Sequence, residues 1–139
     1  MNNKFLNMCK QFFVFCSMGL VNTIAALAVI LVLSEALDVF YLYANILGYG
    51  FGFILSFTLH RNVTFKSMAG HQKIGVEFGK FFIVFIAAFS LQFMALIVMV
   101  KYLHFSELIA QFMAVGIYAL LNFAGNRKIT FRSNTAGSS

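Results

Sequence analysis

Polar side chains that could bind a ligand stand inside long apolar stretches of this sequence. Six carry an amide or a hydroxyl, and they recur as pairs at offsets of 70 or 66 residues: Asn22 with Gln92, Asn45 with Gln111, and Ser56 with Asn122. Two arginines, Arg61 and Arg127, share the offset of 66. Amides and hydroxyls can hydrogen-bond a sugar, and a planar guanidinium suits a phosphate. One interpretation is therefore a polar groove that contacts a sugar or phosphate headgroup.

The same residues also have a purely structural interpretation. Amides inside a membrane can join helices by interhelical hydrogen bonds, and arginines at a membrane surface can simply set the topology. Repetition of a whole octapeptide favours a role for the arginines, because topology needs charge but not Thr-Phe. The two copies are HRNVTFKS at His60–Ser67 and NRKITFRS at Asn126–Ser133. Lys66 and Arg132 are predicted to add secondary phosphate contacts.

The elements that must position these residues are membrane spans. Of the 139 residues, 61% are hydrophobic and 10% charged, whereas a soluble domain is about one quarter charged. Four runs lack any ionised side chain: Gln11–Ser34, Val39–Leu59, Phe81–Val100 and Leu108–Gly125. Each is long enough to cross about 30 Å of hydrocarbon as a helix. We expect an all-α membrane protein with four transmembrane helices in a single domain, residues 1–139.

The distribution of charge predicts the orientation. Nine of the ten Lys and Arg residues fall on one side of the predicted spans, and that side is cytoplasmic by the positive-inside rule. Both termini are therefore expected in the cytoplasm. The spans form two tandem hairpins, repeat one at residues 10–67 and repeat two at residues 80–133, as parallel repeats. Residues 134–139 are expected to be a disordered tail. The net charge of +6 is assigned to topology and anionic lipid rather than to nucleic acid.

Little in the sequence points to catalysis. No carboxylate lies inside a predicted span, so an intramembrane proton relay is not expected. No nucleophile–base set and no cluster of metal ligands appears, so we predict neither an enzyme nor a cofactor nor a metal site. Cys9 and Cys16 are interpreted as thiols without chemistry. The three histidines are interpreted as solvated side chains near the membrane interfaces: His60, His71 and His104.

Three short motifs resemble those of a known family. The first predicted span carries Gly-Leu-Val-Asn-Thr at Gly19–Thr23, similar to a Gly-x-x-Asn-Thr motif. The second and fourth end in His60–Phe65 and Asn126–Phe131, similar to an Asn-Arg-x-x-Thr-Phe motif in which His60 replaces the first Asn. In their order and spacing these residues resemble the GtrA-like family, over about Lys10 to Ser133.

The resemblance implies a function in handling polyprenyl-phosphate-linked sugars. Members are associated with moving such a lipid, bactoprenol-linked glucose for example, across the bacterial inner membrane. Glycosyltransferases on the outer side then use the sugar to modify O-antigen or other polysaccharides. The implied function is thus a flippase for an undecaprenyl-phosphate-type sugar lipid. The alternative is a membrane scaffold that recruits a glycosyltransferase. A homo-oligomer is compatible with either.

Overall fold

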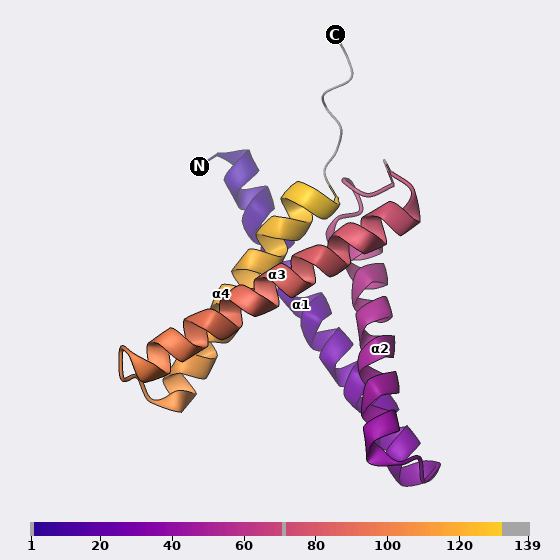
Figure 1. Ribbon diagram of the computed structural model, residues 1–139. Coiled ribbons are helices and arrows are strands. Elements are labelled where there is room, and N and C mark those ends of the chain that lie inside the picture. The colour runs from indigo at the N-terminus through magenta and orange to yellow at the C-terminus, as the bar shows by residue number, and fades with distance from the viewer. Residues whose placement is uncertain (1, 71, 132–139) are drawn as a thin grey trace. The chain divides into compact units, whose positions relative to one another are not determined.

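The computed structural model describes residues 2–70 and 72–131, and over these residues the chain is helical with no strand (Figure 1). Helix α1, Asn3–Leu31, runs into a π-helical turn, η1, at Val32–Ala36. Helix α2, Tyr41–Leu59, ends in a second such turn, η2, at His60–Thr64. Helix α3 spans Ile74–Lys101. Helix α4, Glu107–Gly125, ends in η3, Asn126–Thr130.

Four of these helical segments are long and apolar enough to cross a membrane, so the chain is a multi-pass membrane protein. They are Asn3–Ala36, Tyr41–Thr64, Ile74–Lys101 and Glu107–Thr130. This confirms the predicted all-α class and the number of spans. Arg132 and the tail at residues 134–139, about which predictions were made above, lie outside the described residues.

The helices extend beyond the uncharged runs from which they were predicted. Helix α1 begins at Asn3 rather than near Gln11, because the Asn2 side chain accepts a hydrogen bond from the Lys4 backbone N–H at 3.3 Å and caps the helix. At the other ends, α2 and α4 continue through the octapeptides as η2 and η3. Charged residues mark the boundaries of the predicted spans, but lysine and arginine are good helix formers and need not end a helix.

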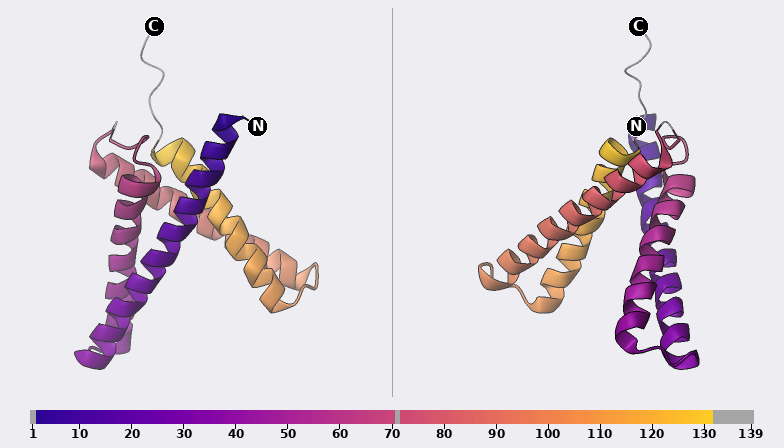
Figure 2. Two further views of the ribbon diagram at one scale, coloured as in Figure 1. Left: turned by 180° about the vertical axis from the view of Figure 1, so that it is seen from behind. Right: turned by 45° about the vertical axis from the view of Figure 1, so that its right-hand side comes forward.

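The chain divides into two compact units, Met1–Lys66 and Ser67–Ser139. The first unit is the hairpin of α1 and α2, and the second contains the hairpin of α3 and α4 (Figure 2). We call these hairpin one and hairpin two. In each hairpin, the basic end is the end that carries an octapeptide, and the tip is the short connection between its two helices.

Hairpin one packs through small residues on α2. Ala44, Gly48 and Gly52 are buried at spacings of four residues, one face of a helix. A Cβ at Gly48 would overlap the Ile30 side chain, and a Cβ at Gly52 would lie 3.0 Å from the Ala26 Cβ. The glycines therefore allow the two helices to approach closely, as small residues do in membrane helix pairs.

Hairpin two packs through a cluster near its tip and a close approach near its basic end. Met99 on α3 is buried together with Ala110 and Ala114 on α4. Towards the basic end, a Cβ at Gly125 would lie 2.6 Å from a methyl carbon of Val84. Alanine and glycine again allow the two helices to approach closely.

A single residue with positive φ closes each tip. Asp38 has φ of 51° and His104 has φ of 54°, and the two positions are related by the offset of 66 residues. In the same turns, the backbone N–H of Val39 donates to the carbonyl of Leu33 at 2.9 Å, and that of Phe105 donates to the carbonyl of Met99 at 3.0 Å. The two tips thus share one local backbone structure.

Substitution of the interface glycine should destabilise hairpin one. We expect Gly52→Leu to cost about 1–3 kcal/mol, because the new side chain must displace Ala26 and its backbone. Gly50→Leu is the matched control, since nothing lies within 4 Å of a Cβ there. Thermal unfolding of the purified protein in detergent checks both. Equal midpoints for the two variants would contradict the close α1–α2 contact.

Candidate functional site

Each octapeptide folds into the same buried turn, which we call the Thr-Phe clamp. It consists of the first octapeptide residue, the Thr four positions later and the Phe that follows. The Phe65 N–H donates to the His60 carbonyl at 2.8 Å, and the Phe131 N–H donates to the Asn126 carbonyl at 2.9 Å. Phe65 and Phe131 are both fully buried. The repeated Thr-Phe is therefore explained by structure: it ends the helix and anchors the end inside the hairpin.

In hairpin one the clamp depends on His60. Its Nδ1 shares a hydrogen bond with the Thr64 Oγ1 at 3.1 Å, and its ring stacks on Phe15 of α1 with centroids 4.3 Å apart. Gln11 of α1 adds a hydrogen bond from its Nε2 to the Thr64 carbonyl at 3.1 Å. His60 is 2% exposed, so the prediction of a solvated histidine at this position was wrong: the ring is part of the packing between α1 and η2.

In hairpin two the clamp extends into a chain of four side chains along one face of α4 and η3. The Thr130 hydroxyl donates to Asn126 Oδ1 at 2.7 Å, and Asn126 Nδ2 donates to Asn122 Oδ1 at 2.9 Å. Asn122 Nδ2 then donates to the Tyr118 hydroxyl oxygen at 3.3 Å. All the donors point the same way, so the bonds polarise one another. The Tyr118 O–H is left as the terminal donor, deep within the span.

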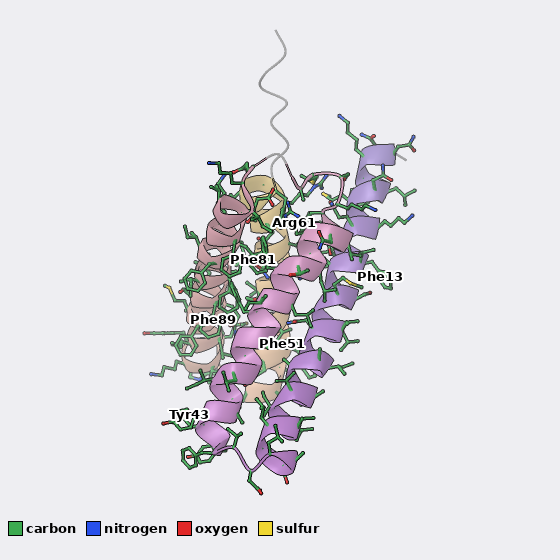
Figure 3. The ribbon with its side chains drawn as sticks, turned by 90° about the vertical axis from the view of Figure 1, so that its right-hand side faces the viewer. Phe13, Tyr43, Phe51, Arg61, Phe81 and Phe89 are labelled. Carbon is green, nitrogen blue, oxygen red and sulfur yellow. The ribbon has the colours of Figure 1, made fainter. Side chains whose placement is uncertain are left out.

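The two arginines lie within the clamp turns, at the second octapeptide position, directly after the first clamp residue. Arg61 lies at the basic end of α2 (Figure 3), and both guanidinium side chains are half-buried. Neither is a member of a clamp. Arg127 makes no hydrogen bond or ion pair with another described residue. Lys66, predicted as a secondary phosphate contact, is exposed immediately after the first clamp.

Asn22 is the predicted ligand residue whose surroundings are most unusual. It lies opposite Gly52, where a Cβ would be 3.9 Å from both of its amide heteroatoms. Its Oδ1 is buried and has no hydrogen-bond partner among the described residues. A buried acceptor without a donor costs about 1–3 kcal/mol. The position therefore suits a donor from water or from a ligand.

The remaining predicted residues have differing environments. Asn45 is half-buried and donates from Nδ2 to the Tyr41 carbonyl of its own helix at 2.7 Å. Asn122 is buried, and both its amide atoms are used in the chain of hairpin two. Ser56 and Gln92 are half-buried and Gln111 is exposed, and none of the three forms a side-chain hydrogen bond to another described residue. The members of each predicted pair therefore do not share one environment.

Within a hairpin the predicted residues are spread along the helices. Asn45 and Arg61 lie on one continuous helical segment, sixteen residues apart, which corresponds to about 24 Å. A ligand could contact both only in succession or with a long headgroup. The predicted residues are therefore spread between the basic end and the tip rather than gathered in one place in a hairpin, and we call this set of residues the polar track.

Two structurally important residues were not among those predicted to bind ligand. Tyr118 falls on the same helical stripe as Asn122, four residues away, and this spacing was the available signal. Glu77 is 1% exposed and accepts a hydrogen bond from the Gly70 N–H at 2.9 Å, which ties the connection between the hairpins to the first turn of α3. Nothing in the sequence marked this carboxylate as buried.

The family model described as GtrA/DPMS, transmembrane domain, matches residues 14–131. The chain belongs to this family. The match includes both clamps, both arginines and the motif at Gly19–Thr23, so the GtrA/DPMS assignment covers the residues that carried the resemblance. It makes the chain a membrane protein of a family associated with lipid-linked sugars. No curated protein and no solved structure matched the chain.

Loss of the clamp hydroxyl should destabilise hairpin two. Thr130→Val keeps the side-chain shape but removes the donor to the buried Asn126 Oδ1, so we expect a cost of about 1–3 kcal/mol. Thr58→Val is the control. The Thr58 hydroxyl bonds only to the Ile54 carbonyl of its own helix on an exposed face, so its loss should change the free energy of unfolding by less than about 0.5 kcal/mol. Chemical denaturation in detergent measures both. A Thr130→Val variant as stable as Thr58→Val would rule out the clamp as an anchor.

Proposed function

We propose that this GtrA/DPMS protein moves a polyprenyl-phosphate-linked sugar across the bacterial inner membrane, for use in cell-surface polysaccharide synthesis. The phosphate binds at the basic ends, the sugar follows the polar track, and the prenyl tail stays in lipid. Both termini are in the cytoplasm in this proposal, in accordance with the side on which the bases gather. The lipid therefore enters from the cytoplasmic leaflet.

The observation that carries the proposal is Arg127, at the second position of the octapeptide in hairpin two. The clamp explains the repeated Thr and Phe, whereas the Arg127 guanidinium bonds to no other described residue. Arg61 occupies the equivalent position of the octapeptide in hairpin one. Each clamp anchors the helix end on which its arginine stands, so the guanidinium loses less freedom when it binds. A preorganised guanidinium at headgroup depth suits a phosphate, which it can bind through two parallel hydrogen bonds.

The polar side chains inside the spans support the sugar part of the proposal. The Asn22 Oδ1 is a buried acceptor that lacks a donor, and the Tyr118 O–H is a donor at the end of a polarised chain. A sugar hydroxyl is both donor and acceptor and can satisfy either group. Ser56, Gln92 and Gln111 offer further groups that are not engaged by other described side chains. Transport is downhill, driven by consumption of the sugar on the far side.

A second candidate is a scaffold that recruits a glycosyltransferase. It is favoured by the internal use of several polar groups, since Asn122, Asn126 and Thr130 bond to one another inside hairpin two. Purified protein in vesicles separates the two candidates. A translocase moves a labelled polyprenyl-phosphate sugar without other proteins, whereas a scaffold leaves it in its original leaflet.

Removal of the free guanidinium should impair transport without unfolding the protein. We expect Arg127→Gln to slow the flipping of a polyprenyl-phosphate sugar about ten- to a hundred-fold, the equivalent of about 1.5–3 kcal/mol for a hydrogen bond to a charged group. Lys128→Gln is the matched control, because it removes the same charge from an exposed neighbour in the same turn. Similar rates for both variants would mean that general charge, not Arg127, attracts the phosphate.

The Tyr118 hydroxyl at the end of the chain in hairpin two should contribute to recognition of the sugar and not of the phosphate. We expect Tyr118→Phe to slow flipping of the sugar-bearing lipid about five-fold, for the loss of about 1 kcal/mol. The rate for polyprenyl phosphate without a sugar should not change. Tyr49→Phe is the control, since Tyr49 is 69% exposed and no described residue bonds its hydroxyl. An equal loss with both lipids would exclude sugar recognition by Tyr118.

A further inference from the structure

Helix α1 is much longer than its partner in hairpin one. The segment Asn3–Ala36 has 34 residues and Tyr41–Thr64 has 24, which correspond to helices of about 51 Å and 36 Å. The hydrogen bond from Gln11 Nε2 to the Thr64 carbonyl sets the level at which α2 ends. Residues 3–10 therefore continue about 12 Å past the basic end of α2, and the ribbon shows α1 leaning away from α2 there (Figure 2).

This extension is amphipathic. At 3.6 residues per turn, one side of about 120° holds every polar residue from position 3 to 11: Asn3, Lys4, Asn7, Lys10 and Gln11. The other side holds every apolar one up to position 13: Phe5, Leu6, Met8, Cys9, Phe12 and Phe13. Because Gln11 bonds to η2, the polar side faces the side of α2, and the apolar side faces away from hairpin one.

Most of the apolar side is open, whereas Phe12 is half-buried. Phe5 is 55% exposed, Leu6 56% and Phe13 73%, and Figure 3 shows Phe13 pointing away from α2. Large apolar side chains past the end of a hairpin would be unfavourable in water, at about 25 cal/mol per Å² of apolar surface. The polar side carries Lys4 and Lys10, and no acidic residue precedes Glu35 in the chain to neutralise them.

We propose that residues 3–10 lie in the headgroup layer of the leaflet at the basic end, with the apolar side against the acyl chains and the two lysines on anionic lipid headgroups. The headgroup layer is about 5–8 Å thick in each leaflet, less than the length of the extension, so a leaning helix fits and an upright one does not. Helices that lie in the membrane interface typically have an apolar side opposite a side that carries lysine or arginine. This inference does not depend on the proposed transport function.

The absence of tryptophan from the chain allows a direct test with the full-length protein. Phe5→Trp and Leu6→Trp each place a single reporter on the apolar side, and Asn7→Trp is the control on the polar side. The proteins are reconstituted into vesicles of phosphatidylcholine and phosphatidylglycerol. Quenching is then compared for aqueous iodide, for lipid brominated near the top of its acyl chains and for lipid brominated near their ends.

We expect the shallow brominated lipid to quench Phe5→Trp and Leu6→Trp several-fold more than the deep one, with little quenching by iodide. Asn7→Trp should be quenched more strongly by iodide than by either brominated lipid. Strong iodide quenching on the apolar side would mean that this side faces water and would overturn the proposal. Protection from iodide and from both lipids would also overturn it, because the cover would then be protein, either hairpin two or a second copy.

The role of the lysines is tested in the same system. Lys4→Gln with Lys10→Gln, in the Phe5→Trp background, should reduce shallow-lipid quenching at least two-fold in the anionic vesicles and leave it unchanged in pure phosphatidylcholine. Lys101→Gln is the charge-matched control, because Lys101 lies at the tip of hairpin two. Equal quenching with and without the two lysines in anionic vesicles would refute their contact with anionic headgroups.

Discussion

A buried hydrogen bond between side chains four residues apart fixes the basic end of each hairpin. His60 with Thr64, and Asn126 with Thr130, make this bond inside the last turn of a helix. The following Phe then enters the hairpin and is fully buried. The orientation of Arg61 and Arg127, and so the proposed phosphate contacts, depends on these turns. If the turn loosens, the arginine on it becomes an ordinary flexible surface charge.

The two hairpins reach the same turn with different partners. Hairpin one uses an imidazole stacked on Phe15 and an amide from Gln11. Hairpin two has Phe81, fully packed, at the position equivalent to Gln11, and satisfies its clamp through Asn122 and Tyr118. The equivalent of Tyr118 in hairpin one is Gly52, which has no hydroxyl to offer the Asn22 amide. Hairpin one therefore has a buried acceptor without a donor, Asn22 Oδ1, whereas hairpin two has a terminal donor, the Tyr118 hydroxyl.

Much of the fold could be predicted from the sequence, because a membrane span is specified by length and lack of charge alone. The four runs gave the four helices, and the matched octapeptides predicted that two helix ends are alike. The site was less predictable. A polar residue in a span can bond to its own helix, as Asn45 does, or to a neighbour, as Asn122 does, or remain unpaired, as Asn22 Oδ1 does. Which of these outcomes occurs depends on the positions of side-chain atoms to within a few ångströms, and the spacing of residues in the sequence does not specify those positions. His60 was misjudged for the same reason: an aromatic partner, Phe15, lies far away in the sequence.

The single left-handed residues at Asp38 and His104 limit what projects from the tips. The connection in each hairpin consists only of residues 37–40 or 102–106. Neither tip therefore carries a large loop to which another protein could bind from the aqueous side. If the protein transports a lipid-linked sugar as proposed, a protein that collects the lipid at that face must insert into the bilayer or lie flat on its surface. Handover would then occur at membrane depth, with no need for the cargo to enter open water.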